Sequence, residues 1–142
     1  MAFTVRAVEV FVADVRNRPG MLARVLEALR NAQANLEFVI ARRITEDTSR
    51  IFVAPLKGIA QRRAAADVGM VPAVGLHTVR IEGPDRAGLA ADLSRALAAA
   101  EINLRGMSAA TIGRKSVIYL AFESQPDADQ GTRVVRAALR RK

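Results

Sequence analysis

The sequence predicts an α+β fold built from two copies of one module, each ordered strand, helix, strand, strand, helix, strand. Residues 17–22 recur as residues 85–90, and an Asn-Leu pair follows each copy at the same distance. The apolar patterns around them also recur in the same order, which indicates an internal repeat. We therefore expect two modules, residues 1–74 and 75–142, with antiparallel sheets and helices on one face. The repeat leaves open whether the two sheets join into one continuous sheet.

The first copy opens with a strand followed by a helix. Valines at every second position of residues 8–12 predict a strand with that face in the core. The helix is expected to take Asn17 or Arg18 as its cap, with Pro19 in its first turn. Its apolar residues recur at helical spacing, and Asn35 is expected to end it.

The later elements of the first copy follow from the same patterns. They are expected at residues 36–44 (strand), 51–56 (strand), 59–68 (helix) and 70–74 (a short extended segment). In the first of these strands we expect Val39 and Ala41 to face the core.

The second copy repeats this order. Val79 and Ile81 mark its first strand, and leucines at intervals of four predict a helix. Two strands are expected at residues 102–112 and 117–122, and a last helix is expected to be capped by residues 126–129.

The second copy stops at this helix, while the chain starts with an additional extended piece. Superposing the copies places Met1 on Met70 and Val5 on Val74. The repeating unit is therefore permuted. We expect residues 2–5 to complete the sheet of the second module, in the same chain or in a partner, because an unpaired edge would favour aggregation.

The composition excludes several classes of protein. The chain has 142 residues, no cysteine and an apolar fraction of 51%. These values suit a packed core and exclude disulfides and thiolate metal sites. Neither a membrane-spanning run nor a signal-peptide pattern is present, so a cytoplasmic location is the expectation. The net charge of +8 favours anionic partners, although the arginines are spread over both copies.

The repeated corner has the chemistry of a small-molecule site. A helix start offers free N–H groups and a positive dipole end to a carboxylate, and a glycine there lets a ligand approach the backbone. Amide side chains can bond both ends of a zwitterion. The predicted ligand-binding residues are Asn17, Arg18, Pro19, Gly20, Met21, Leu22, Asn35 and Leu36. A second, weaker site is predicted at Asp85, Arg86, Gly88, Leu89 and Asn103, because the Asp85 carboxylate would cap the helix and compete with a bound carboxylate.

The corner, the element order and the asparagines resemble the ACT domain, a family of small ferredoxin-like modules that sense amino acids. The resemblance covers nearly the whole chain as a tandem pair and implies a non-catalytic regulatory protein. In the serine-sensing module of 3-phosphoglycerate dehydrogenase, the residues matching Asn17 and Asn35 hold the effector across a module interface. A histidine contact there falls on Val15, so serine itself is not implied. The first copy is also similar to the regulatory subunit of acetolactate synthase.

The resemblance implies a free amino acid as ligand, and a homodimer, a metabolic enzyme or a regulator as partner. Family members pair through the edge strand at residues 37–44, so an interaction module without a ligand stays open. A basic nucleic-acid-binding protein of the same fold is the other alternative, but the exposed aromatics that it needs are too few. No cofactor, metal site or catalytic residue is predicted, since His77 has no acid or nucleophile at a telling spacing.

Overall fold

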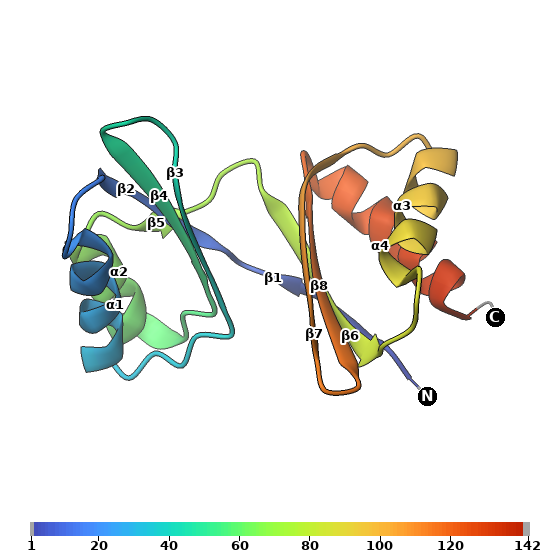
Figure 1. Ribbon diagram of the computed structural model, residues 1–142, viewed down its shortest axis with the longest axis horizontal. Coiled ribbons are helices and arrows are strands. Elements are labelled where there is room, and N and C mark those ends of the chain that lie inside the picture. The colour runs from blue at the N-terminus through green and yellow to red at the C-terminus, as the bar shows by residue number, and fades with distance from the viewer. Residues whose placement is uncertain (1, 141–142) are drawn as a thin grey trace. The chain divides into compact units, whose positions relative to one another are not determined.

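The computed structural model describes residues 2–140, which form two α+β modules (Figure 1). Module 1 contains β2 (Phe11–Arg16), α1 (Met21–Asn31), β3 (Phe38–Arg43), β4 (Thr48–Ala54), α2 (Gly58–Asp67) and β5 (Val71–Pro72). Module 2 contains β1 (Thr4–Val8), β6 (His77–Pro84), α3 (Leu89–Ala99), β7 (Leu104–Ile112), β8 (Lys115–Phe122) and α4 (Gln125–Arg140).

Each module has a four-stranded antiparallel sheet with two helices on one face (Figure 1). The strand order is β3-β4-β2-β5 in module 1 and β7-β8-β6-β1 in module 2. The predicted fold class is confirmed. Among the described residues the strands form two sheets, not one continuous sheet.

The first strand of the chain belongs to the sheet of module 2. In β1, Val5 lies opposite Ile81 of β6, and Arg136 of α4 donates a hydrogen bond of 2.9 Å to the Val5 carbonyl. This strand takes the edge position that β5 holds in module 1, and it starts at Thr4 rather than Ala2. The predicted boundary at residue 74 places β1 in module 1, whereas its pairing with β6 places β1 in the unit formed by the residues from Val74 onward. Module 1 is therefore an insert between β1 and β6.

The core of module 1 forms on the opposite strand face from the one that the valines predicted. Phe11 and Ala13 are buried with Val25 and Leu29 of α1, so Val12 lies on the helix-free face. Both residues of β3 that were predicted to face the core, Val39 and Ala41, are exposed, and Val39 is 44% exposed. The cause is the position of β3 at the edge of the sheet, where few neighbours cover it.

The core of module 2 follows the predicted helical stripe. Leu89, Leu93 and Leu97 of α3 are buried against the sheet, as their spacing predicted. Phe122 of β8 is fully buried, and a Cβ added to Gly131 of α4 would lie 2.5 Å from its ring. The glycine is therefore required by the close approach of α4 to this ring, despite its low helix propensity.

The helix starts differ from the predicted caps. The N-cap of α1 is Gly20, with φ of 92°, and the N-cap of α3 is Gly88, with φ of 82°. Neither helix has a side-chain cap, so Asn17, Arg18 and Pro19 lie in the turn before α1. The glycine conformation explains this, because the left-handed region at the cap position strongly favours glycine.

The helix ends also differ from the prediction, because Asn35 lies beyond the end of α1. Gln33 and Glu101 adopt positive φ values of 66° and 58° at matching positions after α1 and α3. The next residue of each, Ala34 or Ile102, donates back to the helix, the pattern of a Schellman motif. The cap of α4 is Ser124, whose Oγ accepts from the Asp127 N–H at 3.2 Å, rather than residues 126–129.

Candidate functional site

The corner of module 1 contains a hollow of about 250 Å³. It lies between the β2–α1 turn and the ends of β3 and β4. Its lining residues are Val15, Arg16, Asn17, Arg18, Met21, Leu22, Ala41, Arg42, Arg43, Ser49 and Ile51. The pocket is open to solvent, and its floor is apolar while much of its rim is basic.

Asn17 connects the turn to the β3–β4 hairpin. Its Nδ2 donates to the Glu46 carbonyl at 3.0 Å, its Oδ1 accepts from Ser49 Oγ at 3.2 Å, and its backbone N–H donates to the Asp47 carbonyl at 2.8 Å. The side chain therefore shapes the pocket wall. A carboxamide still has a second N–H and a second oxygen lone pair for a ligand.

The start of α1 adds donors to the same corner. Because no side chain caps the helix and its first turn holds no acidic residue, its first N–H groups and positive dipole end are available to an anion. The φ of Gly20 makes the sharp turn that presents these groups.

The structure separates the predicted residues of the first site. Asn17, Arg18, Met21 and Leu22 line the pocket, and Pro19 and Gly20 form the turn behind it. The other two predicted residues, Asn35 and Leu36, follow the far end of α1. Eleven helical residues span roughly 16 Å. Within one module, Asn17 and Asn35 therefore cannot contact the same small ligand.

The corner of module 2 repeats this geometry with different chemistry. A hollow of about 330 Å³ is lined by the predicted Asp85, Arg86, Gly88 and Leu89, while Asn103 follows the far end of α3. We predicted that the Asp85 carboxylate caps α3, but it does not. It accepts from Ser116 Oγ at 2.6 Å and from Thr111 Oγ1 at 3.4 Å.

Sequence reasoning missed the serine that both corners use. Ser49 pairs with Val15, two residues before Asn17, and bonds the Asn17 side chain. Ser116 pairs with Gly83, two residues before Asp85, and bonds the Asp85 side chain. An alignment of the two copies that includes their hairpins would have shown this serine. The sequence also gives no sign that Arg42 and Arg43 belong to the site, because nothing in the spacing places the end of β3 beside the corner.

One carboxylate in each sheet, Asp14 and Glu82, is held by basic side chains. Arg50 donates hydrogen bonds of 2.7 and 3.0 Å to Asp14, and these bonds hold the pKa of the Asp14 carboxyl below its usual range. In module 2, hydrogen bonds from Arg80 and Lys115 lower the pKa of Glu82. Both carboxylates therefore stay ionised at neutral pH.

The chain matches the profile of the ACT domain twice, over residues 8–67 and 77–140. It belongs to the ACT-domain family. The family supports a regulatory, ligand-sensing role in general. No curated protein sequence matches the chain significantly.

Solved structures share the tandem architecture. Protein BT0572 from Bacteroides thetaiotaomicron superposes with a TM-score of 0.78 at 17% identity, covering 94% of this chain and 89% of its own. The ligand-free regulatory subunit of aspartate kinase from Thermus thermophilus gives 0.66 at 16%, covering 96% and 95%. Aspartokinase III from E. coli, in complex with aspartate and ADP, gives 0.61 at 14%, covering 97% of this chain and 33% of its own. At these identities the likeness concerns the fold.

Across residues 2–140, no group of three His, Cys, Asp or Glu side chains could hold a metal ion. In the same range, no helix has the length and apolarity to span a membrane.

Proposed function

We propose that this ACT-domain protein is a non-catalytic regulatory module that binds a free amino acid at the corner of module 1 and controls a partner enzyme or regulator. The observation that carries the proposal is the pocket of about 250 Å³ beside the uncapped start of α1. At about 30 Å³ per water, this volume holds roughly eight waters, which is the size of one amino acid. Helix N–H groups can take its carboxylate, and Asn17 can bond its ammonium group.

Module 1 is the principal site in this proposal. The corresponding Asp85 of module 2 carries a negative charge, which opposes a carboxylate bound at the start of α3. Several structural neighbours are regulatory parts of aspartate kinases, which supports a metabolic enzyme as the regulated partner.

A thermal-shift screen of the full chain against the twenty amino acids tests the proposal, because a ligand at 100 times its Kd adds about 2.7 kcal/mol of stability. Leu22 lines the pocket and is 40% exposed, so Leu22→Trp should fill the site and abolish the shift without unfolding module 1. The matched control is Ala90→Trp at the corresponding position of module 2. Absence of a shift with every amino acid, or a shift that Leu22→Trp leaves intact, would overturn the proposal.

A second candidate function is association through an edge strand. β7 lies at the edge of its sheet, and its segment from Gly106 to Ile112 carries no charge, although charges normally protect exposed edges. Ala110→Lys would place a charge on this edge. If β7 pairs with a second copy, light scattering should show the variant as a monomer and the parent chain as a dimer.

A further inference from the structure

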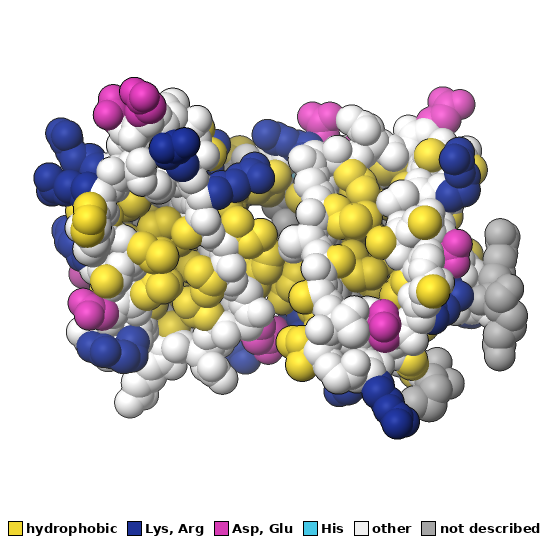
Figure 2. Space-filling model, in the orientation of Figure 1, with side chains coloured by type: hydrophobic (Ala, Val, Ile, Leu, Met, Phe, Trp, Pro, Cys, Tyr) yellow, Lys and Arg dark blue, Asp and Glu magenta, His cyan; other side chains and the backbone are white. Residues whose placement is uncertain are grey.

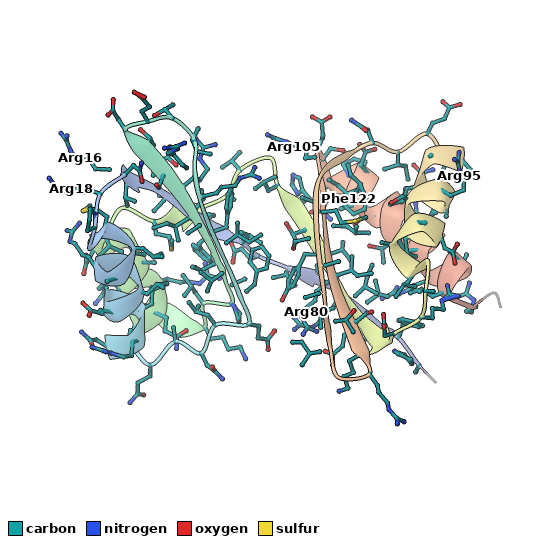
Figure 3. All side chains as sticks on the ribbon, viewed as in Figure 1. Arg16, Arg18, Arg80, Arg95, Arg105 and Phe122 are labelled. Atoms are coloured by element: carbon teal, nitrogen blue, oxygen red, sulfur yellow. The ribbon has the colours of Figure 1, made fainter. Side chains whose placement is uncertain are left out.

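Arginines dominate the rim of the module 1 pocket. Arg16 comes from the end of β2, Arg18 from the turn, and Arg42 and Arg43 from the end of β3. In Figure 3, Arg16 and Arg18 project beside the start of α1, and Figure 2 shows Lys and Arg side chains gathered at this corner. Four arginines and no acidic residue line this hollow. Because side chains alternate along a strand, Arg16 and Arg42 start from the helix-free face, so Arg18 and Arg43 are the arginines placed to contact a ligand.

These four side chains have no acidic partner within residues 2–140. Asp14 of β2 is engaged by Arg50, and within the described residues Glu46 and Asp47 of the β3–β4 turn form no ion pair with the rim arginines. Elsewhere in the chain, arginines such as Arg62 and Arg86 do form ion pairs, with Glu9 and Asp92. The rim therefore concentrates positive charge that the chain itself leaves uncompensated.

Module 2 shows that the fold does not require these charges. In module 1, Arg42 pairs with Arg50 and Arg43 pairs with Ser49. At the corresponding positions of module 2, Ala110 pairs with Val117 and Thr111 pairs with Ser116, so these positions carry no charge. Likewise, Pro84 of module 2 corresponds to Arg16, since each ends the strand that leads into the corner of its module. The second corner keeps one arginine, Arg86, and pairs it with Asp92 at 3.3 Å.

The charge excess identifies the class of ligand. Like charges around a concave surface repel one another and concentrate anions. An amino acid with a neutral side chain has no net charge and uses one cationic group for its carboxylate. Guanidinium groups bind carboxylates and phosphates with paired hydrogen bonds, so several of them can hold two acidic groups at once.

We propose that the module 1 pocket binds a small anion with two acidic groups, either a dicarboxylic amino acid or a phosphorylated small molecule. The proposal rests on the proposed function for the location of the site, and it adds the charge of the ligand. The pocket volume suits either source. The concave shape favours a small ligand over a nucleic-acid strand, which would need an extended groove.

Calorimetry on the full chain at low salt tests the proposal with isosteric pairs. The probes are aspartate against asparagine, glutamate against glutamine, and phosphoserine against serine, with inorganic phosphate as a further probe. We expect at least one acidic probe to bind about tenfold or more tightly than its neutral partner. Preference for aspartate or glutamate identifies a dicarboxylic ligand, and preference for phosphoserine a phosphorylated one.

Variants locate the effect. Arg42→Ala with Arg43→Thr installs the residues of module 2, so it should remove the preference for the acidic probe while the fold is kept. Arg95→Ala, an exposed arginine of α3, is the control and should leave the preference unchanged.

Three results would overturn the proposal. If the neutral partner binds equally or more tightly, the ligand does not need a second acidic group, but the proposed amino-acid sensing still stands. No binding of any probe by the parent chain removes the acidic ligand, and the thermal-shift screen against the twenty amino acids then decides whether the proposed function stands. Binding of single-stranded oligonucleotide that depends on Arg42 and Arg43, with no binding of the small probes, assigns the rim to nucleic acid.

Discussion

The two corners have the same backbone and opposite electrostatics. Each corner follows the strand that precedes a helix, β2 in module 1 and β6 in module 2. Each contains a glycine with positive φ and leads into a helix without a side-chain cap. The side chain that ties the turn to the hairpin is neutral in module 1 and a carboxylate in module 2, and the basic rim is present in module 1 alone. Duplication has thus preserved the geometry that makes a pocket, while the charges that choose a ligand have diverged.

The largest effect is expected from a charge placed in β1. Val5 is 9% exposed and packs in the core of module 2, so Val5→Asp should cost several kcal/mol. Hydrogen exchange should then show protection lost in β6 and β8 and retained in β2 and β4. The control is Val71→Asp in β5, where the side chain is already 55% exposed. Equal loss of protection in both modules would show that they do not fold separately.

The shared serine offers a direct measure of the difference in charge. Ser116→Ala should cost about 1.5–3 kcal/mol, because it removes a short hydrogen bond to the Asp85 carboxylate. Ser49→Ala removes a bond to a neutral amide and should cost only about 0.5–1.5 kcal/mol. Denaturant unfolding measures both values. If the two costs were equal, the charge of Asp85 would have no part in holding its hairpin.

The helix ends should behave alike in the two modules. Gly is the residue best suited to the positive φ of Gln33 and Glu101, but it also loses more entropy on folding. Gln33→Gly and Glu101→Gly should therefore each stabilise the chain by roughly 0.5 kcal/mol. Thermal unfolding checks this, and a loss of stability at either position would contradict the Schellman geometry there.

The smallest effect concerns acid. Because hydrogen bonds from Arg50 lower the folded-state pKa of Asp14, the pair stabilises the folded state above the unfolded pKa of about 4. This contribution is lost as the pH falls through the lowered folded value. The pair is exposed and screened by solvent, so its contribution is expected to be smaller than those of the other variants. Unfolding curves from pH 7 to 3 should show it, and Asp14→Asn should have a flatter profile in this range.

The sequence predicted the repeat and the element order better than it predicted details within each element. Residues 10–13 are all apolar, so alternation alone could not decide that Phe11 and Ala13, rather than Val12, enter the core. The positive φ of Gln33 was also hidden, because that conformation is set by the hydrogen bonds that close the helix. The position of Asn35 beyond the far end of α1 depends on the length and direction of the helix, which cannot be read from residue types alone.

The insertion of module 1 between β1 and β6 fixes an order of events during synthesis. The ribosome makes β1 before module 1, but its partner β6 emerges only after all of module 1 has been made. Module 1 has every strand of its sheet at that point and can fold while the chain is still growing. β1 must meanwhile wait as an unpaired strand, so a segment that is translated before module 1 reaches its native place only after module 1 is complete.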